Sequence, residues 1–253
     1  MILRPCVTRQ LDRAKVFVAR AVVTFHSIDD SGSVLSFAPR AFAQLIERFA
    51  ASATPVVTFE ELLRRDDGIT LTFDDGMRSV FEHALPVLRE HGFPAHVFLT
   101  TSRVGQDIGW PAQPQRFCML DWSQVEQCAQ SGLSIECHTV THPDLRELSA
   151  QRILDECKGA DDAIERHTSQ RPTLMAFPFG LYNRSVLDAV ASRYSACFTT
   201  KLGYLKNATD LARVPRLDSY YLKAPLFNER LFSAPTRAYV ALRASIRAVR
   251  SAV

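Results

Sequence analysis

Four side chains in two short segments of this chain could hold a metal ion and activate water beside it. Asp74 and Asp75 are adjacent and are followed by Gly76, while His138 and His142 lie four positions apart. One carboxylate and two imidazoles form a three-ligand set that leaves coordination positions open for water and substrate. The second carboxylate can then stay ionised and act as a general base. The pattern therefore predicts a mononuclear metal hydrolase.

Each segment alone has a plainer explanation. The two aspartates and Gly76 could form a turn that caps the following helix, and histidines four residues apart often bind no metal. At that spacing, however, two imidazoles can reach one ion across a helical turn. The occurrence of both segments in one chain favours the metal site. Mixed oxygen and nitrogen ligands suit Zn²⁺, with Co²⁺, Ni²⁺ or Mn²⁺ as alternatives.

The elements that must position these side chains alternate between strands and helices. Apolar or β-branched runs predict strands at residues 21–25, 55–59, 69–73, 95–100, 133–137, 174–177 and 196–200. Helical spacing of apolar residues predicts helices at 39–50, 77–91, 121–131, 149–167 and 183–193, with Asp121, Ser149 and Asn183 as N-caps. This alternation predicts a mostly parallel sheet in an α/β protein, and the absence of a dinucleotide-binding motif favours barrel-like closure. Residues 106–119 have no period and predict a long loop that could form one wall of a substrate site.

Composition narrows the class of protein. The chain has 253 residues, 47% of them hydrophobic, and a net charge of only +3, which argues against a nucleic-acid partner. Its six scattered cysteines predict small buried side chains and not a disulfide framework. Residues 1–15 are charged and lack the apolar core of a signal peptide, so a cytoplasmic location is expected.

The chain resembles the polysaccharide deacetylases, the carbohydrate esterase family 4 or NodB-homology group. The first signature of that family matches residues 72–76, the second matches 138–143, and the third, an aromatic-Pro-aromatic-Gly loop, matches 177–180. The similarity extends from about residue 22 to residue 215. It implies a distorted (β/α) barrel with about seven parallel strands in a single domain, assigned to residues 1–235. It also implies hydrolysis of an N-acetyl or related acyl group on an N-acylated carbohydrate.

The resemblance also implies roles for individual residues. Asp75, His138 and His142 would bind the metal, and Asp74 would be the general base. The backbone N–H of Phe179, beside Gly180, would stabilise the oxyanion.

Two parts of the family pattern are altered. The late histidine that usually serves as general acid is missing, and His26, which follows the apolar run 22–25, is the expected replacement. The arginine that often begins the third signature is also missing. Arg213 or Arg216 could take its place, with Asp218 completing the pair.

Residues 236–253 predict a basic amphipathic helix. Leu242, Ile246, Val249 and Val253 share one face, with Arg243, Arg247 and Arg250 along its edge. Such a helix could lie on the inner face of a membrane, where a lipid-linked sugar would become an attractive substrate. The alternative is that it packs on the barrel.

Three functions follow from these patterns. The leading one is a metal-dependent N-deacetylase acting on an amino-sugar-containing glycan or a lipid-linked sugar. The second is a hydrolase of another C–N bond, in a formamido sugar or a non-sugar amide, which would release a different acid. The third is a carbohydrate-binding barrel without activity, against which the intact Asp74, Asp75, His138 and His142 argue.

Overall fold

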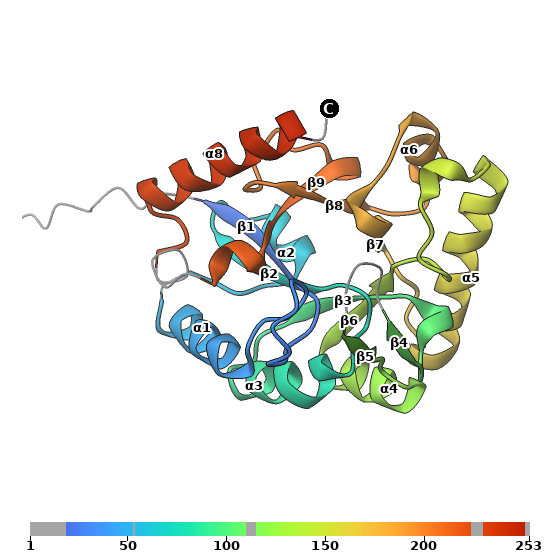
Figure 1. Cartoon of the computed structure of the whole chain (residues 1–253), viewed down its shortest axis with the longest axis horizontal. Helices are drawn as coiled ribbons and strands as arrows, with labels where there is room; N and C mark the ends of the chain where they lie inside the picture. The colour runs from blue at the N-terminus through green and yellow to red at the C-terminus, as the bar shows by residue number, and fades with distance from the viewer. Residues whose placement is uncertain (1–18, 53, 110–114, 224–229, 251–253) are drawn as a thin grey trace, which may run out of the picture.

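Seven parallel strands form a closed barrel with helices packed around it (Figure 1). The structure is a computed structural model that describes residues 19–52, 54–109, 115–223 and 230–250. In barrel order the strands are β1 (Arg20–Phe25), β2 (Gly68–Phe73), β3 (Ala95–Leu99), β6 (Leu133–Cys137), β7 (Leu174–Ala176), β8 (Ala196–Leu202) and β9 (Val214–Asp218). β9 closes the barrel on β1, with Leu217 opposite Val23. The predicted α/β barrel of parallel strands is confirmed.

One predicted strand is wrong, and one strand of the barrel was not predicted. Residues 55–59 contribute only a single bridge between Val56 and Ile69, and Phe59 begins the short helix α2 (Phe59–Leu63). The reason is local, because Thr58 and Glu61 form a capping box that starts a helix at this point. The missing strand is β9, whose apolar pattern is interrupted by Pro215 and Arg216.

The outer helices cover the barrel wall. They are α1 (Pro39–Ala51), α3 (Leu85–Glu90), α4 (Trp122–Gln130), α5 (Ala150–Thr168), α6 (Arg184–Val190) and α8 (Ala234–Arg250). The side chains of Asp121, Ser149 and Asn183 each accept a backbone N–H hydrogen bond at the start of a helix, so all three predicted caps are confirmed. The helix predicted from residue 77 begins later, with a π-helical turn, η1 (Val80–Ala84), directly before α3.

Alternation along the strands separates the barrel interior from the layer beneath the helices. Phe98 of β3 and Phe198 of β8 share one buried cluster with Phe59, whose ring lies 4.8 Å from that of Phe198. Since every second residue of a strand points to the same side, the inward set of β2 continues through Thr72 to Asp74. The apolar interior therefore gives way to polar side chains at the carboxyl ends of the strands, where barrel enzymes carry their active sites.

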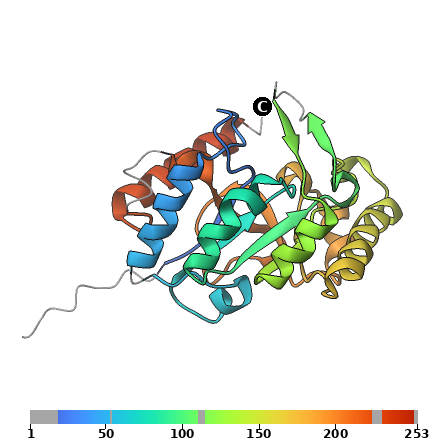
Figure 2. The same cartoon turned by 90° about the horizontal axis from the view of Figure 1, so that it is seen from below.

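The segment predicted as a loop at 106–119 contains an antiparallel pair, β4 (Asp107–Gly109) and β5 (Arg116–Cys118). Figure 2 shows this pair (green arrows) extending away from the barrel. Directly after β5, Met119 forms a backbone bridge with Met77. This bridge connects the antiparallel pair to the loop after β2.

The C-terminal helix α8 packs on the barrel through one side. Thr236 and Val240 are buried, whereas Leu242 and Ile246, on the face predicted to be apolar, are 60% and 41% exposed. The guanidinium groups of Arg243 and Arg247 lie over the ring of Tyr221. The other residues of that face lie outside the described side chains. No described helix is long and apolar enough to cross a membrane, and contact of α8 with a membrane surface stays a prediction without support.

Candidate active site

The three predicted metal ligands meet in one buried cluster. One ligand atom each from Asp75, His138 and His142 lies within 4.8 Å of the other two. Asp75 Oδ1 is 3.4 Å from Nε2 of His138 and 3.5 Å from Nε2 of His142. Asp75 follows β2 and the histidines follow β6, so the cluster lies where the carboxyl ends of neighbouring barrel strands converge.

The backbone around this cluster adopts conformations that side chains normally avoid. Among the described residues, five that are not glycine have positive φ, and four of them lie here: Asp75 (73°), Thr139 (68°), His142 (60°) and Phe179 (58°). Such conformations cost free energy and persist where the surroundings enforce them, most often at functional sites. They also correct the expectation of a helical turn between the histidines. Residues 139–142 form an irregular turn, and its left-handed residues bring the imidazole rings to a centroid distance of 4.8 Å.

Glu156, on helix α5, holds this turn in place. Its Oε2 accepts hydrogen bonds from the backbone N–H groups of Val140 (3.0 Å) and Thr141 (2.8 Å), and its Oε1 accepts one from the Thr141 hydroxyl (2.8 Å). Thr139 Oγ1 also accepts from the N–H of His142 at 3.0 Å. The sequence analysis did not find Glu156, because it lies 14 residues beyond His142 within an ordinary amphipathic helix.

The protonation states suit a metal ligand set. His138 Nδ1 lies 2.8 Å from the carbonyl oxygen of Ala176, an arrangement in which Nδ1 donates its hydrogen and Nε2 is left free to coordinate. Burial, assisted by the nearby His138, lowers the pKa of His142 to about 3, so that its imidazole is neutral at ordinary pH.

Asp75 supplies the observation that tests whether a metal fits. Burial alone would raise the pKa of Asp75, but hydrogen bonding to His138 and the charges of nearby histidines lower it, which keeps the carboxylate ionised. Asp75 Oδ2 is buried and has no hydrogen-bond partner among the described residues. A buried, ionised oxygen without a partner is costly, and a divalent cation between Asp75 and the histidines would remove that cost. The residues present therefore fit the group that the resemblance implies.

Asp74 is held by a buried arginine. Arg216 of β9 donates to both carboxylate oxygens, from Nη1 to Oδ1 at 2.7 Å and from Nη2 to Oδ2 at 2.6 Å. Burial opposes ionisation of Asp74, but the charge and hydrogen bonds of Arg216 outweigh it and hold the pKa of this carboxyl well below its usual range. Asp74 is therefore an ionised carboxylate directly beside the proposed metal ligands.

The sequence analysis named Arg213, Arg216 and Asp218 as replacements for the missing arginine and its partner. Of these, Arg216 is the one that contacts Asp74. Arg213 is exposed on the surface and pairs with Asp210 at 2.7 Å. Asp218 caps the turn η6 (Ser219–Leu222) by accepting from the N–H of Tyr220. The strand explains the difference: residues 214–218 alternate sides, so Arg216 points into the barrel while Arg213 precedes the strand.

The loop after β7 forms another wall of the site. The ring of Phe179 is 44% exposed and lies 4.5 Å from that of His142. The next residue must be glycine, because a Cβ at position 180 would lie 2.5 Å from the backbone nitrogen of Thr200 and the backbone has φ of +70°. Thr200 Oγ1 donates to the carbonyl oxygen of Phe179 at 3.4 Å, which ties this loop to β8.

The side chains of His26 and Arg103 lie near the carboxylates. His26 follows β1, half-buried, and the N–H of Asp74 donates to the neighbouring carbonyl oxygen of Phe25 at 2.9 Å. A positive charge on His26 would act on both Asp74 and Asp75. Arg103, missed in the sequence analysis, ends the turn η2 (Thr101–Arg103) and is attracted by Asp75.

The turn η2 also connects the two segments that carry the predicted metal ligands. The backbone N–H of Thr100, directly before it, donates to the carbonyl oxygen of Asp75, and that of Ser102 donates to the carbonyl oxygen of Val140.

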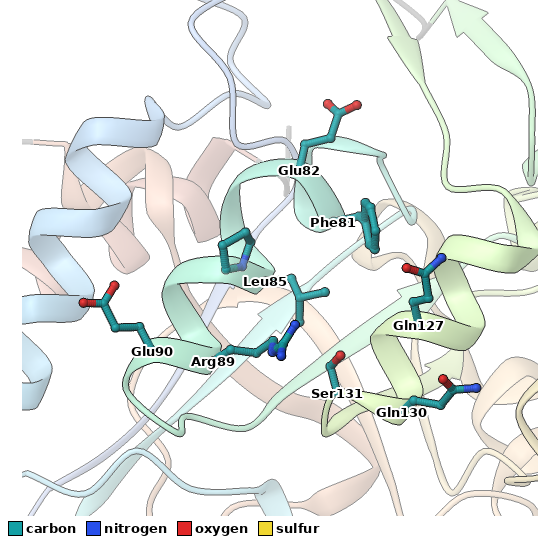
Figure 3. A pocket seen from close by; sticks show the side chains of 9 residues that line it. Phe81, Glu82, Leu85, Arg89, Glu90, Gln127, Gln130 and Ser131 are labelled. Carbon is teal, nitrogen blue, oxygen red and sulfur yellow. The ribbon is translucent and has the colours of Figure 1, made fainter.

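The site is separate from a cavity of about 720 Å³ on the outside of the barrel. Figure 3 shows that cavity between η1, α3 and α4, with Phe81, Leu85 and Gln127 among its lining residues. None of the residues assigned above to the candidate active site lines it. The volume of a cavity therefore does not identify the candidate active site of this protein. The arrangement of Asp75, His138 and His142 does.

We expect His138→Ala to abolish metal binding, because only two ligands would remain. Purified wild-type protein reconstituted with Zn²⁺ should hold about one ion per chain, as catalytic zinc sites with three protein ligands do. The variant should hold almost none by elemental analysis. His167→Ala is the control, because Nδ1 of His167 lies 3.0 Å from Glu126 Oε1 and this histidine does not belong to the cluster. Equal metal content in wild type and His138→Ala would contradict the ligand assignment.

Comparison with known proteins identifies the family. Residues 64–194, just over half of the chain, match the sequence profile of polysaccharide deacetylases. The putative polysaccharide deacetylase YxkH of Bacillus subtilis is 28% identical over 136 residues, which are 53% of this chain and 45% of that protein. The match thus spans less than half the length of that relative.

Solved structures agree on the fold. A deacetylase of Streptococcus pyogenes, PplD, solved with acetate, has a TM-score of 0.70 at 24% identity and covers 79% of this chain and 92% of its own. IcaB of Ammonifex degensii has the same TM-score at 20% identity, covering 83% and 97%. The sequence match, together with the barrel and the arrangement of its carboxylates and histidines, shows that the chain belongs to the polysaccharide deacetylase family.

Proposed function

We propose that this protein is a metal-dependent hydrolase that removes N-acetyl groups from an amino-sugar-containing glycan or a lipid-linked sugar. The observation that carries the proposal is the carboxylate of Asp74, kept ionised by Arg216 beside the buried cluster of Asp75, His138 and His142. Membership of the polysaccharide deacetylase family supports this reaction class.

The residues divide the work between them. Asp75, His138 and His142 would hold one divalent transition metal, with Zn²⁺ as the first candidate and Co²⁺, Ni²⁺ or Mn²⁺ as alternatives. When bound, such an ion polarises the acyl carbonyl and lowers the pKa of a water molecule. Asp74 would accept the proton of the attacking water, and Arg216 would hold its carboxylate toward that position.

Two further groups complete the proposed reaction. The backbone N–H of Phe179 would donate to the oxyanion that forms when water adds to the carbonyl, and Gly180 permits the turn that presents it. The departing amine must be protonated, because an amide anion is a very poor leaving group. His26, across the site from the loop after β7, is the proposed general acid.

Acetate release tests the reaction. We expect the zinc-loaded protein to release acetate from N-acetylated chitooligosaccharides, measured by an enzyme-coupled acetate assay. Asp74→Asn should remove nearly all turnover while the metal is retained, because the amide cannot accept the proton. Release of formate from N-formyl sugars in place of acetate would favour the hydrolase of another C–N bond. No product from any N-acyl substrate, with metal bound, would overturn the proposal.

The Arg216 contact predicts a change in pH dependence. Arg216→Met removes the charge that lowers the pKa of Asp74, so burial will raise that pKa. The base will then stay protonated, and inactive, up to a higher pH than in the wild type. The acid limb of kcat/KM on a small neutral N-acetyl substrate should therefore move to higher pH. Arg213→Met is the matched control, because Arg213 is exposed and paired with Asp210, and it should leave the limb in place. The same profile in all three proteins would show that Arg216 does not set the ionisation of Asp74.

His26→Ala should separate metal binding from turnover. We expect normal metal content but kcat lower by about a hundredfold or more, the range reported for loss of a general acid. His83→Ala, an exposed histidine in η1, should change neither quantity. Unchanged kcat in His26→Ala would remove this residue from the mechanism.

A further inference from the structure

Two adjoining cavities lie on the side of the barrel formed by β8, β9 and the segment between them. One, of about 480 Å³, lies beside the start of β1 and the end of α2. The other, of about 340 Å³, lies against the end of β8. Lys206 and Thr209 line both cavities, so the two cavities adjoin at these residues, and we call the pair of cavities the β8 track.

The β8 track concentrates the positive charge of the chain. Its lining contains six cationic side chains and two carboxylates: Arg20, Arg64, Arg65, Lys201, Lys206 and Arg213, with Asp66 and Asp210. This excess of four exceeds the net charge of +3 of the whole chain. Arg213 is neutralised by Asp210 and Arg65 by Asp67. Within the described ranges, Arg64, Lys201 and Lys206 have no carboxylate within 4.0 Å.

The buried side chain of Arg20 adds to the positive charge of the β8 track. Its residue is only 6% exposed, and its guanidinium donates to the carbonyl oxygens of Leu62 (3.3 Å) and Leu63 (3.4 Å) and to Asn207 Oδ1 (2.7 Å). These partners are neutral, so they satisfy its hydrogens without compensating its charge. A buried cation at the wall of a cavity strengthens the attraction for an anion, because little water screens it.

One end of the β8 track is lined by residues that lie next to the active-site loop along the chain. Tyr182, which lines it, follows Gly180 by two residues, and Lys201 follows Thr200, the residue that contacts both Phe179 and Gly180. The residues that follow this loop and its contact with Thr200 therefore contribute to the lining of the cavity. Tyr182 and Tyr204 provide aromatic surface among the cations, and sugar rings can stack on such surface.

We propose that the β8 track binds the carboxylate-bearing sugars of an acidic polysaccharide whose N-acylated residue occupies the active site. The identity of the ligand as a glycan rests on the proposed function, because Tyr182 of the track directly follows, by two residues, the loop assigned to oxyanion stabilisation. The positive charge and the aromatic surface together select sugar rings with negative substituents. A duplex nucleic acid would need a wider basic face than this chain, with its net charge of +3, provides.

Binding without turnover tests the proposal. Oligogalacturonate, a polymer of uronic acid sugars, is titrated into the metal-loaded protein by calorimetry at low and high salt. Lys201→Glu/Lys206→Glu reverses two charges of the track, and we expect about a tenfold or greater loss of affinity, because charged hydrogen-bonded contacts are lost. The control is Arg152→Glu/Arg166→Glu, which makes the same charge change on exposed residues of α5. It should alter affinity by less than about twofold, as expected for screened surface charges.

The outcomes separate this proposal from the proposed function. Unchanged oligogalacturonate affinity in Lys201→Glu/Lys206→Glu, or an equal loss in the control, would overturn the β8 track. Equal affinity of the wild type for duplex DNA or for vesicles of phosphatidylglycerol would also overturn it, since the charge would then be unselective. Acetate release from small neutral substrates should be the same in wild type and Lys201→Glu/Lys206→Glu. If oligogalacturonate binding depends on the two lysines but no substrate releases acetate, the β8 track is supported as a binding site and the proposed function is contradicted.

Discussion

The buried ion pair between Asp74 and Arg216 is the contact on which the site depends. Both side chains are nearly inaccessible to water, and Arg216 also lies over the rings of Phe98 and Phe198 inside the barrel. A buried pair of this kind often contributes little to stability, because desolvation of two charges offsets their attraction. Its clear effect is on protonation, since it keeps a carboxylate ionised where burial alone would neutralise it. The pair therefore makes sense as part of a reactive site.

The pair also explains why closure of the barrel matters. Asp74 follows β2 and Arg216 lies in β9. The two residues are 142 positions apart along the chain, but only β1 lies between the two strands in the barrel. The rings of Phe98 and Phe198 pack beside Arg216 in the interior, and the charges meet in a layer at the carboxyl ends of the strands. The same layer holds Asp75 and His138. The carboxylate of Asp74 thereby pairs with the arginine and that of Asp75 lies beside the histidines, although the two residues are adjacent in sequence.

Backbone strain and its support form the second constraint. Asp75, Thr139, His142 and Phe179 occupy left-handed conformations, and the hydrogen bonds of Glu156 hold the turn between the histidines. Strain of this kind must be offset by the surrounding fold. Helix α5 provides part of that support, while η2 bridges the turn to Asp75 through backbone hydrogen bonds. Helix α5 and the turn η2 thus help to determine how Asp75 and the two histidines are positioned.

The sequence by itself determined the family, the alternation of strands and helices, and the identity of Asp74, Asp75, His138 and His142 as neighbours. These follow from local patterns: apolar runs define strands, capping side chains define helix starts, and reactive residues follow strand ends. Only the tertiary structure decided that residues 55–59 are not a strand, that β9 closes the barrel, and that Arg216, and not Arg213, contacts Asp74. The same holds for the support from Glu156. Those outcomes depend on the barrel register and on which side of a strand a residue faces, and these are set by packing between segments far apart in the chain.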